Sequence, residues 1–140
     1  MPRVVLDTDV IVSGALIPRG HPGQILQAWR DGRFLLILSE DIIEEVKEVL
    51  NRPRIRNKYQ HLTSATMGRL ITLLRRHSLL VPGRLKLAVV TRDPDDDKVL
   101  IAAIEGRADY IVTGDADLVD LKSYQGITII RPAEFVKLLP

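Results

Sequence analysis

Acidic residues stand in separate stretches of this 140-residue chain, at points where strands should end or helices should begin. They are Asp7, Glu45, Asp96, Asp115 and Asp117. In an α/β sheet, ligands bind outside the carboxyl ends of the strands. Acids gathered there repel one another unless a cation holds them, and a cluster that offers only oxygen suits Mg²⁺ or Mn²⁺. The pattern therefore predicts a metal-dependent enzyme that acts on phosphate esters.

Helical phase selects one acid from the expected helix that Ser39 caps and that runs to about residue 51. With 3.6 residues per turn, Glu45 lies beside Val49 at the edge of the apolar stripe. Glu44 and Glu48 should point to solvent. Glu45 is thus the acid that can reach inward, although the alternative is that all three only solvate the helix.

The acidic triplet at 95–97 divides in the same way. Asp95 is expected to cap a helix that runs to about residue 106. Asp96 falls in the middle of the buried face set by Val99 and Leu100, and Asp97 points more outward. Because a carboxylate on a buried face is costly unless it is paired or metal-bound, Asp96 is the strongest single ligand candidate.

Two further acids should meet at one edge of the sheet. Asp7 directly follows an apolar strand, Asp115 follows another strand and a glycine, and Asp117 lies two residues on. Asp117 could cap a helix or complete the site, and Asp7 could itself be an ordinary helix cap. Hydroxyl groups that could orient the carboxylates, or equally only cap helices, are those of Thr8, Ser13 and Thr113.

Strands and helices are expected to alternate along the chain. The expected strands or extended segments are 3–6, 34–38, 79–81, 87–91, 110–112 and 127–130. The expected helices are 10–17, 23–31, the helix after Ser39, 64–77, the helix from Asp95, a short one ending at 121, and 132–138; residues 54–60 form a short helix or a loop. This alternation predicts an α/β fold with a mostly parallel central sheet and helices on both faces.

Composition limits the class of protein. A chain of 140 residues with 46% hydrophobic residues is expected to form a single domain over residues 1–140. It has no cysteine, which excludes disulfides, thiolate metal sites and cysteine nucleophiles. No apolar run reaches the roughly 20 residues of a membrane helix, and the start lacks a signal-peptide layout. These features predict a cytoplasmic protein that does not enter membranes.

Basic residues crowd one segment, although the net charge is only +2. They are Arg52, Arg54, Arg56 and Lys58. Such a cluster beside an acidic pocket could bind the phosphates of RNA. The alternative is a solvated helical face.

Taken in order, four stretches resemble the PIN-domain ribonucleases, and the likeness covers essentially the whole chain. These stretches are 5–13, 38–45, 93–98 and 108–118. The chain is most similar to the prokaryotic branch of VapC-like toxins from toxin–antitoxin systems. One departure concerns Asp9, which stands where the family usually has asparagine after the Asp-Thr pair. The extra negative charge at Asp9 is expected to alter metal affinity.

The resemblance implies that Asp7, Glu45, Asp96 and Asp115 form the catalytic acidic quartet, with Asp117 as an accessory metal ligand. It also implies a Rossmann-like three-layer PIN fold, Mg²⁺ or Mn²⁺ as the cofactor and RNA as the substrate. The expected partners are a second copy of the chain, in a homodimer or higher homo-oligomer, and a cognate antitoxin. One or two cations would activate the phosphate and a water for in-line attack, so no protein nucleophile is required.

Two other interpretations remain open at this stage. In a haloacid-dehalogenase-like phosphatase, Asp7 and Asp9 would be nucleophile and acid/base, and Asp115 with Asp120 would form the late acidic motif. That assignment leaves Glu45 without a role. The other alternative is a PIN module that binds RNA or a protein partner without cleaving. Assays for phosphate release and for RNA cleavage, run side by side, separate the three.

Overall fold

Within residues 1–87 and 94–139, which the computed structural model describes except for the side chains of 94–96, a six-stranded sheet has the order β3-β2-β1-β4-β6-β5. The strands are β1 (Arg3–Leu6), β2 (Leu35–Ser39), β3 (Leu79–Val81), β4 (Tyr110–Val112), β5 (Ser123–Tyr124) and β6 (Ile127–Ile130). All neighbouring strands are parallel except β5 and β6. The predicted mostly parallel sheet is confirmed.

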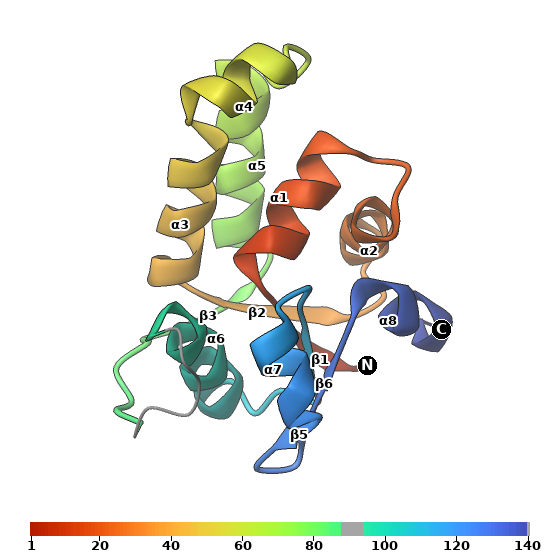
Figure 1. Cartoon of the computed structure of the whole chain (residues 1–140), viewed down its shortest axis with the longest axis vertical. Helices are drawn as coiled ribbons and strands as arrows, with labels where there is room; N and C mark the ends of the chain where they lie inside the picture. Colours follow the sequence, from red (N-terminus) through yellow and green to blue (C-terminus); the bar gives the residue numbers. More distant parts are fainter. Residues whose placement is uncertain (88–93, 140) are drawn as a thin grey trace.

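Helices cover both faces of this sheet. They are α1 (Thr8–Leu16), α2 (His21–Arg30), α3 (Glu40–Leu50), α4 (Pro53–Lys58), α5 (Ser64–Arg76), α6 (Pro94–Glu105), α7 (Ala116–Leu121) and α8 (Pro132–Leu138). Figure 1 shows α6 and α8 on opposite sides of the sheet. Helix α6 packs against β1, β2 and β4, and α2 packs against α8. The three-layer α/β fold is therefore confirmed.

The central strand β1 fixes the level of the sheet's carboxyl edge. Its residues Val4 to Leu6 are fully buried, as expected for a parallel strand covered on both faces. In the register of β1 and β4, Leu6 pairs with Val112. The residues that follow them, Asp7 and Thr113, therefore emerge side by side at the same edge.

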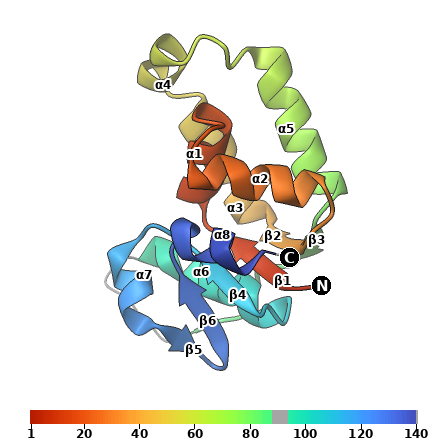
Figure 2. The same ribbon diagram turned by 90° about the vertical axis from the view of Figure 1, so that its right-hand side faces the viewer.

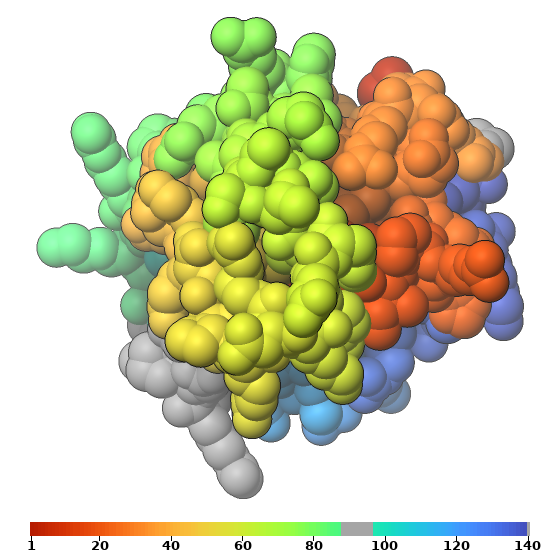
Figure 3. All heavy atoms as spheres, turned by 90° about the horizontal axis from the view of Figure 1, so that it is seen from above, coloured from red at the N-terminus to blue at the C-terminus, as the bar shows by residue number. Residues whose placement is uncertain are grey.

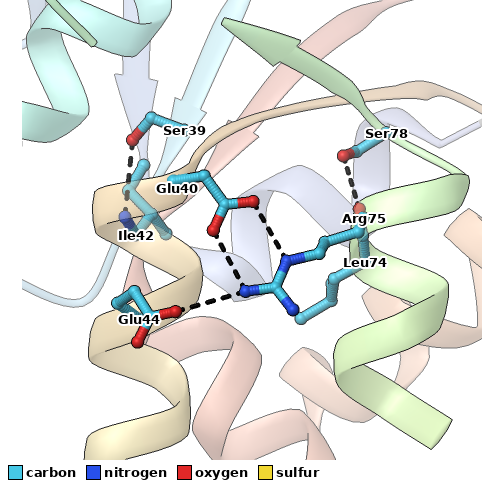
Figure 4. Close-up of polar contacts among 7 residues, drawn as sticks. All are labelled: Ser39, Glu40, Ile42, Glu44, Leu74, Arg75 and Ser78. Carbon is cyan, nitrogen blue, oxygen red and sulfur yellow. Dashed lines mark hydrogen bonds and ion pairs between the residues drawn. The ribbon is translucent and has the colours of Figure 1, made fainter. Parts of the chain in front are cut away.

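A pair of helices stands away from the sheet. Figures 1 and 2 show α3 and α5 rising from it, with α4 near the end of α3 that is farthest from it. Arg75 on α5 clamps the pair: its Nε lies 3.0 Å from Glu40 Oε1 and its Nη2 3.2 Å from Glu44 Oε1 (Figure 4). The α3–α5 clamp therefore uses the outward-facing acids of α3.

Several element boundaries differ from the sequence predictions. Helix α1 begins at Thr8 rather than at residue 10, because the Asp7 side chain accepts the Thr8 N–H and caps the helix. Helix α6 begins at Pro94, so Asp95 lies inside its first turn rather than at its cap. Of the predicted extended segment 87–91, residues 88–91 lie outside the described part of the chain.

Among the described residues, no helix has both the length and the apolar character that crossing a bilayer requires.

Candidate metal centre at the carboxyl edge of the sheet

Among the acids of the predicted site whose side chains are described, Asp7 is the most enclosed, with 9% of its surface exposed. Its Oδ1 accepts a hydrogen bond from the Thr8 N–H at 2.7 Å, and its Oδ2 accepts one from the Thr113 hydroxyl at 2.8 Å. The fully buried Thr113 Oγ1 also accepts the Asp115 N–H at 3.0 Å. Thr113 thus ties the two acids of neighbouring strands together.

Burial makes the negative charge on Asp7 costly. Desolvation, with the nearby Asp9 charge next, raises the pKa of Asp7 to about 6 from its ordinary 3.8. The hydrogen bonds from Thr113 and Thr8 lower this pKa, while the more distant Glu45 raises it. A cation at Asp7 would remove much of this cost.

Asp9, in the first turn of α1, holds the loop at Gly114. Its Oδ2 accepts the N–H of Gly114 at 3.0 Å, and a Cβ atom at Gly114 would lie only 2.7 Å from that oxygen. Glycine is therefore required for this approach. Desolvation raises the pKa of Asp9, the Gly114 N–H lowers it, and the charge of Asp115 raises it. In place of the family's usual asparagine, Asp9 adds charge that acts directly on Asp7.

Asp115 begins α7. Its Oδ1 accepts the N–H of Asp117 at 2.8 Å and caps the helix. Asp115 is partly buried and Asp117 is exposed. In the described part of the chain, the second carboxylate oxygen of Asp115 accepts no hydrogen bond. Asp115 can therefore offer one oxygen to a ligand, while Asp117 stands at the outer margin of the site.

Glu45 faces inward and forms an ion pair with Lys98 of α6. The Glu45 side chain is 25% exposed, whereas the Glu44 side chain is 58% exposed and bound to Arg75. Helical phase therefore gives the orientation that the structure has. Lys98 received no role from the sequence, and the only signal for it was its place directly after three acids.

The pKa of Glu45 reflects opposing effects. Partial burial raises it, but the hydrogen bond from Lys98, the Thr8 hydroxyl and the charges of Lys98 and Arg52 together hold it below its ordinary value. Glu45 is therefore ionised at neutral pH. Arg52 acts on it although it lies seven residues further along the chain.

Two oxygen atoms in this region are buried without a hydrogen-bond partner of normal geometry among the described residues. They are Asp97 Oδ1 and Thr8 Oγ1; the Thr8 hydroxyl is close enough to Glu45 to lower its pKa but forms no hydrogen bond of normal geometry. Asp97 is only partly exposed and one of its carboxylate oxygens is buried, while the expectation that it points more outward than Asp96 stays a prediction, because the Asp96 side chain lies outside the described part of the structure. Buried, unpartnered oxygens are places where an ion or a water is needed.

Asp96 is the third residue of α6, but its side chain lies outside the described part of the structure. Ser13 is partly buried on α1, and its hydroxyl makes no hydrogen bond to an acid among the described residues. The assignments of Asp96 and Ser13 therefore stay predictions.

The donor set fits a hard divalent cation. The carboxylates are charge-crowded, orphaned oxygens lie among them, and no nitrogen or sulfur ligand from the described residues competes. The described residues alone, without the Asp96 side chain, bring no three acids or histidines close enough to hold an ion. The prediction that Asp7, Glu45, Asp96 and Asp115 together hold Mg²⁺ or Mn²⁺ therefore stays a prediction.

The basic segment lies at and beyond the outer end of α3. Figure 3 shows the molecule from above, where the yellow and yellow-green surface around α4 is nearest the viewer. Arg52 pairs with Glu48 at 3.2 Å, and Arg56 donates to Ser64 at 3.0 Å. Lys58 lies 5.5 Å from the ring centre of Tyr59. Arg54 is exposed. The basic segment therefore lies around the end of α3 that is farthest from the sheet (Figure 1), and the charge of Arg52 acts on Glu45.

Known proteins resemble this chain in sequence and in fold. Residues 3–117 match the family model described as PIN domain. A curated, uncharacterized protein from Methanocaldococcus jannaschii is 31% identical over 120 residues, which is 86% of this chain and 75% of that protein. A crystal structure of VapBC2 from Rickettsia felis, bound to a DNA fragment from the promoter, matches in fold with a TM-score of 0.58. That match covers 92% of this chain and 98% of the other, at 12% identity.

Proposed function

Because the chain belongs to the PIN domain family, we propose that it is a metal-dependent endoribonuclease that hydrolyses RNA phosphodiester bonds. The observation that carries the proposal is the buried, charge-crowded Asp7, joined through Thr113 to Asp115 and faced by the inward-turned Glu45. Such a set of oxygens is suited to a divalent cation and to little else.

Each residue has a defined part in the proposed mechanism. Asp7, Glu45, Asp96 and Asp115 bind the cation, which supplies Lewis-acid activation of the phosphate and of the attacking water. Thr113 holds Asp7 and the start of α7 in a fixed relation, as residues behind metal ligands commonly do. Asp9 fixes the Gly114 loop at the mouth of the site.

Excess EDTA is expected to lower RNA cleavage by about tenfold or more, and added Mn²⁺ or Mg²⁺ is expected to restore it. The measurement is gel-resolved cleavage of a mixed-sequence single-stranded RNA by the purified protein. A generic phosphomonoester is assayed in parallel, and no phosphate release from it is expected. Undiminished RNA cleavage in EDTA would contradict the metal-dependent mechanism. Metal-dependent phosphate release from the phosphomonoester would favour the phosphatase alternative.

In the cell, we propose that the protein acts as the toxin of a toxin–antitoxin pair in the cytoplasm. The support is the fold shared with the crystal structure of VapBC2. The expected partners are a cognate antitoxin and a second copy of the chain. A small open reading frame next to the gene, whose product suppresses the cleavage, is the observation that would support the antitoxin.

The exposed basic segment is proposed to bind the RNA backbone. Changing Arg54 and Lys58 together to glutamine should weaken RNA binding about tenfold and flatten its salt dependence by about 1.4 log units per log unit of salt, the value for two lost phosphate contacts. These two residues are chosen because Arg56 helps to join α4 to α5 through Ser64. Fluorescence anisotropy over a range of NaCl concentrations, in EDTA, gives both quantities.

The matched control changes Arg30 and Arg33 to glutamine. These exposed residues lie at the opposite, amino-terminal edge of the sheet, and the change removes the same two charges. If both double variants lose affinity equally, the effect is one of net charge, and the segment around α4 is then an ordinary solvated surface.

A further inference from the structure

One proposed metal ligand, Glu45, already has a cationic partner. Lys98 of α6 reaches across to Glu45 of α3, two helices that pack against each other. Its side chain is 19% exposed and that of Glu45 is 25% exposed. Every other ion pair in the described part of the chain has both side chains at least 40% exposed. This ion pair is therefore the one most withdrawn from solvent.

Lys98 differs in position from Arg75, whose ion pairs with α3 are exposed. Lys98 follows Asp96 by two residues and Asp97 by one, and so belongs to the same helical turn as a proposed metal ligand. Its ammonium group contacts Glu45, another proposed ligand. By contrast, Arg75 joins α3 to α5 through the outward-facing Glu40 and Glu44. The α3–α6 contact thus uses a carboxylate that the metal would need.

An ammonium ion and a divalent cation cannot share one carboxylate without strong repulsion, because water screens them poorly in a partly buried site. Without a cation, the neighbouring carboxylates repel one another, and leaving them unpaired in a partly buried site costs free energy. Some positive charge must therefore be present in either state of the centre.

We propose that Lys98 is a built-in counter-cation that occupies Glu45 in the metal-free protein and is displaced when a divalent cation binds. The proposal rests on the proposed metal-dependent function. Lys98 then has two effects: it keeps the acidic centre folded without metal, and it sets the metal concentration at which the centre fills. Removing the ammonium group should therefore tighten metal binding, which loss of a merely structural contact would not do.

The test measures Mn²⁺ binding by isothermal titration calorimetry, without RNA. In Lys98→Met, the dissociation constant for Mn²⁺ is expected to fall about tenfold, because the metal no longer competes with a neighbouring charge. The melting temperature in EDTA is expected to fall, because Glu45 loses its partner. An unchanged or weaker affinity for Mn²⁺ would overturn the proposal.

Two variants separate charge exchange from other effects. Lys47→Met removes the same charge from an exposed position on α3 and should leave the dissociation constant within about twofold. Lys98→Arg keeps the cation and should not tighten binding. If Lys98→Met does not fold, Lys98→Gln provides the neutral variant, because its amide can still donate to Glu45, and the same tightening is expected.

The outcome is separable from that of the proposed function. If the wild-type protein binds Mn²⁺, Lys98→Met binds it more tightly and neither cleaves RNA, then the ribonuclease proposal fails and the counter-cation proposal stands. If the wild-type protein does not bind Mn²⁺, or if Glu45→Gln does not weaken that binding, then the counter-cation proposal fails.

Discussion

Replacing Glu45 with glutamine is expected to reduce RNA cleavage at saturating RNA and Mn²⁺ by at least about 100-fold. Glu45 faces inward on α3, is ionised at neutral pH and is a proposed metal ligand. Glutamine has nearly the same shape but no charge, so it fills the space and holds the cation poorly. Initial rates of cleavage under these conditions measure the effect.

Glu44→Gln is the matched control, one residue away on the same helix. Its side chain is exposed, and Arg75 keeps Glu40 as its main partner when Glu44 is neutral (Figure 4). The cleavage rate should therefore stay within about twofold of the wild-type rate, since exposed ion pairs contribute little. The opposite result, with Glu44→Gln inactive and Glu45→Gln active, would mean that α3 presents its other face to the substrate.

The fold was predictable where burial is complete. Strand β1 agrees with its predicted bounds because its apolar run is covered on both faces and ends at a charged residue. Strand β5 was missed, since its two residues carry no apolar pattern. It exists because the turn at Gln125 and Gly126, both with positive φ, folds it back onto β6. A tertiary pairing of this kind leaves little trace in local sequence.

The acidic residues of the candidate site were predictable from the sequence, but the lysine that pairs with one of them was not. Asp7 and Asp115 follow neighbouring parallel strands, so chain order alone places them at one edge. Glu45 follows from the helical period. Lys98 reaches Glu45 across 53 positions of sequence, through the packing of α3 on α6. No local pattern encodes that approach.

The phosphatase alternative loses support from the position of Asp120. It needs Asp9 as the acid/base, and one oxygen of the Asp9 carboxylate accepts the Gly114 N–H. It also needs Asp120 in the site, and Asp120 is exposed on α7. The non-catalytic alternative predicts RNA binding without cleavage, so the cleavage assay decides it.

Asp7→Asn is expected to reduce RNA cleavage by at least about 1,000-fold and, in EDTA at pH 7, to raise the melting temperature by about 3–6 °C. Asparagine keeps the helix-capping oxygen for the Thr8 N–H but removes a buried charge. Loss of activity with gain of stability distinguishes a ligand from a structural cap. Cleavage assays and calorimetric unfolding of the same preparations measure the two effects.

The stability difference should depend on pH in a defined direction. The pKa of Asp7 is about 6 in the folded protein, against its ordinary value of 3.8 in an unfolded chain. Between these values the folded state binds more protons, so the Asp7 contribution to stability is fully present below about pH 4 and is lost as pH rises to 6. The full loss is at most about 3 kcal/mol, at 1.36 kcal/mol for each pH unit. Asp7→Asn should therefore match the wild-type protein near pH 4 and exceed it at pH 7.

A bound metal ion should make the wild-type protein more stable than Asp7→Asn at pH 7. Saturating Mn²⁺ stabilises the wild-type protein by binding only its folded state, and Asp7→Asn should gain much less. Asp120→Asn, which changes an exposed acid on α7, should alter neither the cleavage nor the pH dependence. A fall of several degrees for Asp7→Asn in EDTA at pH 7 would show that the hydrogen bonds of Asp7 outweigh its buried charge. In that case Asp7 would stabilise the fold without a metal ion, and the clustered acids would no longer be evidence for a cation site.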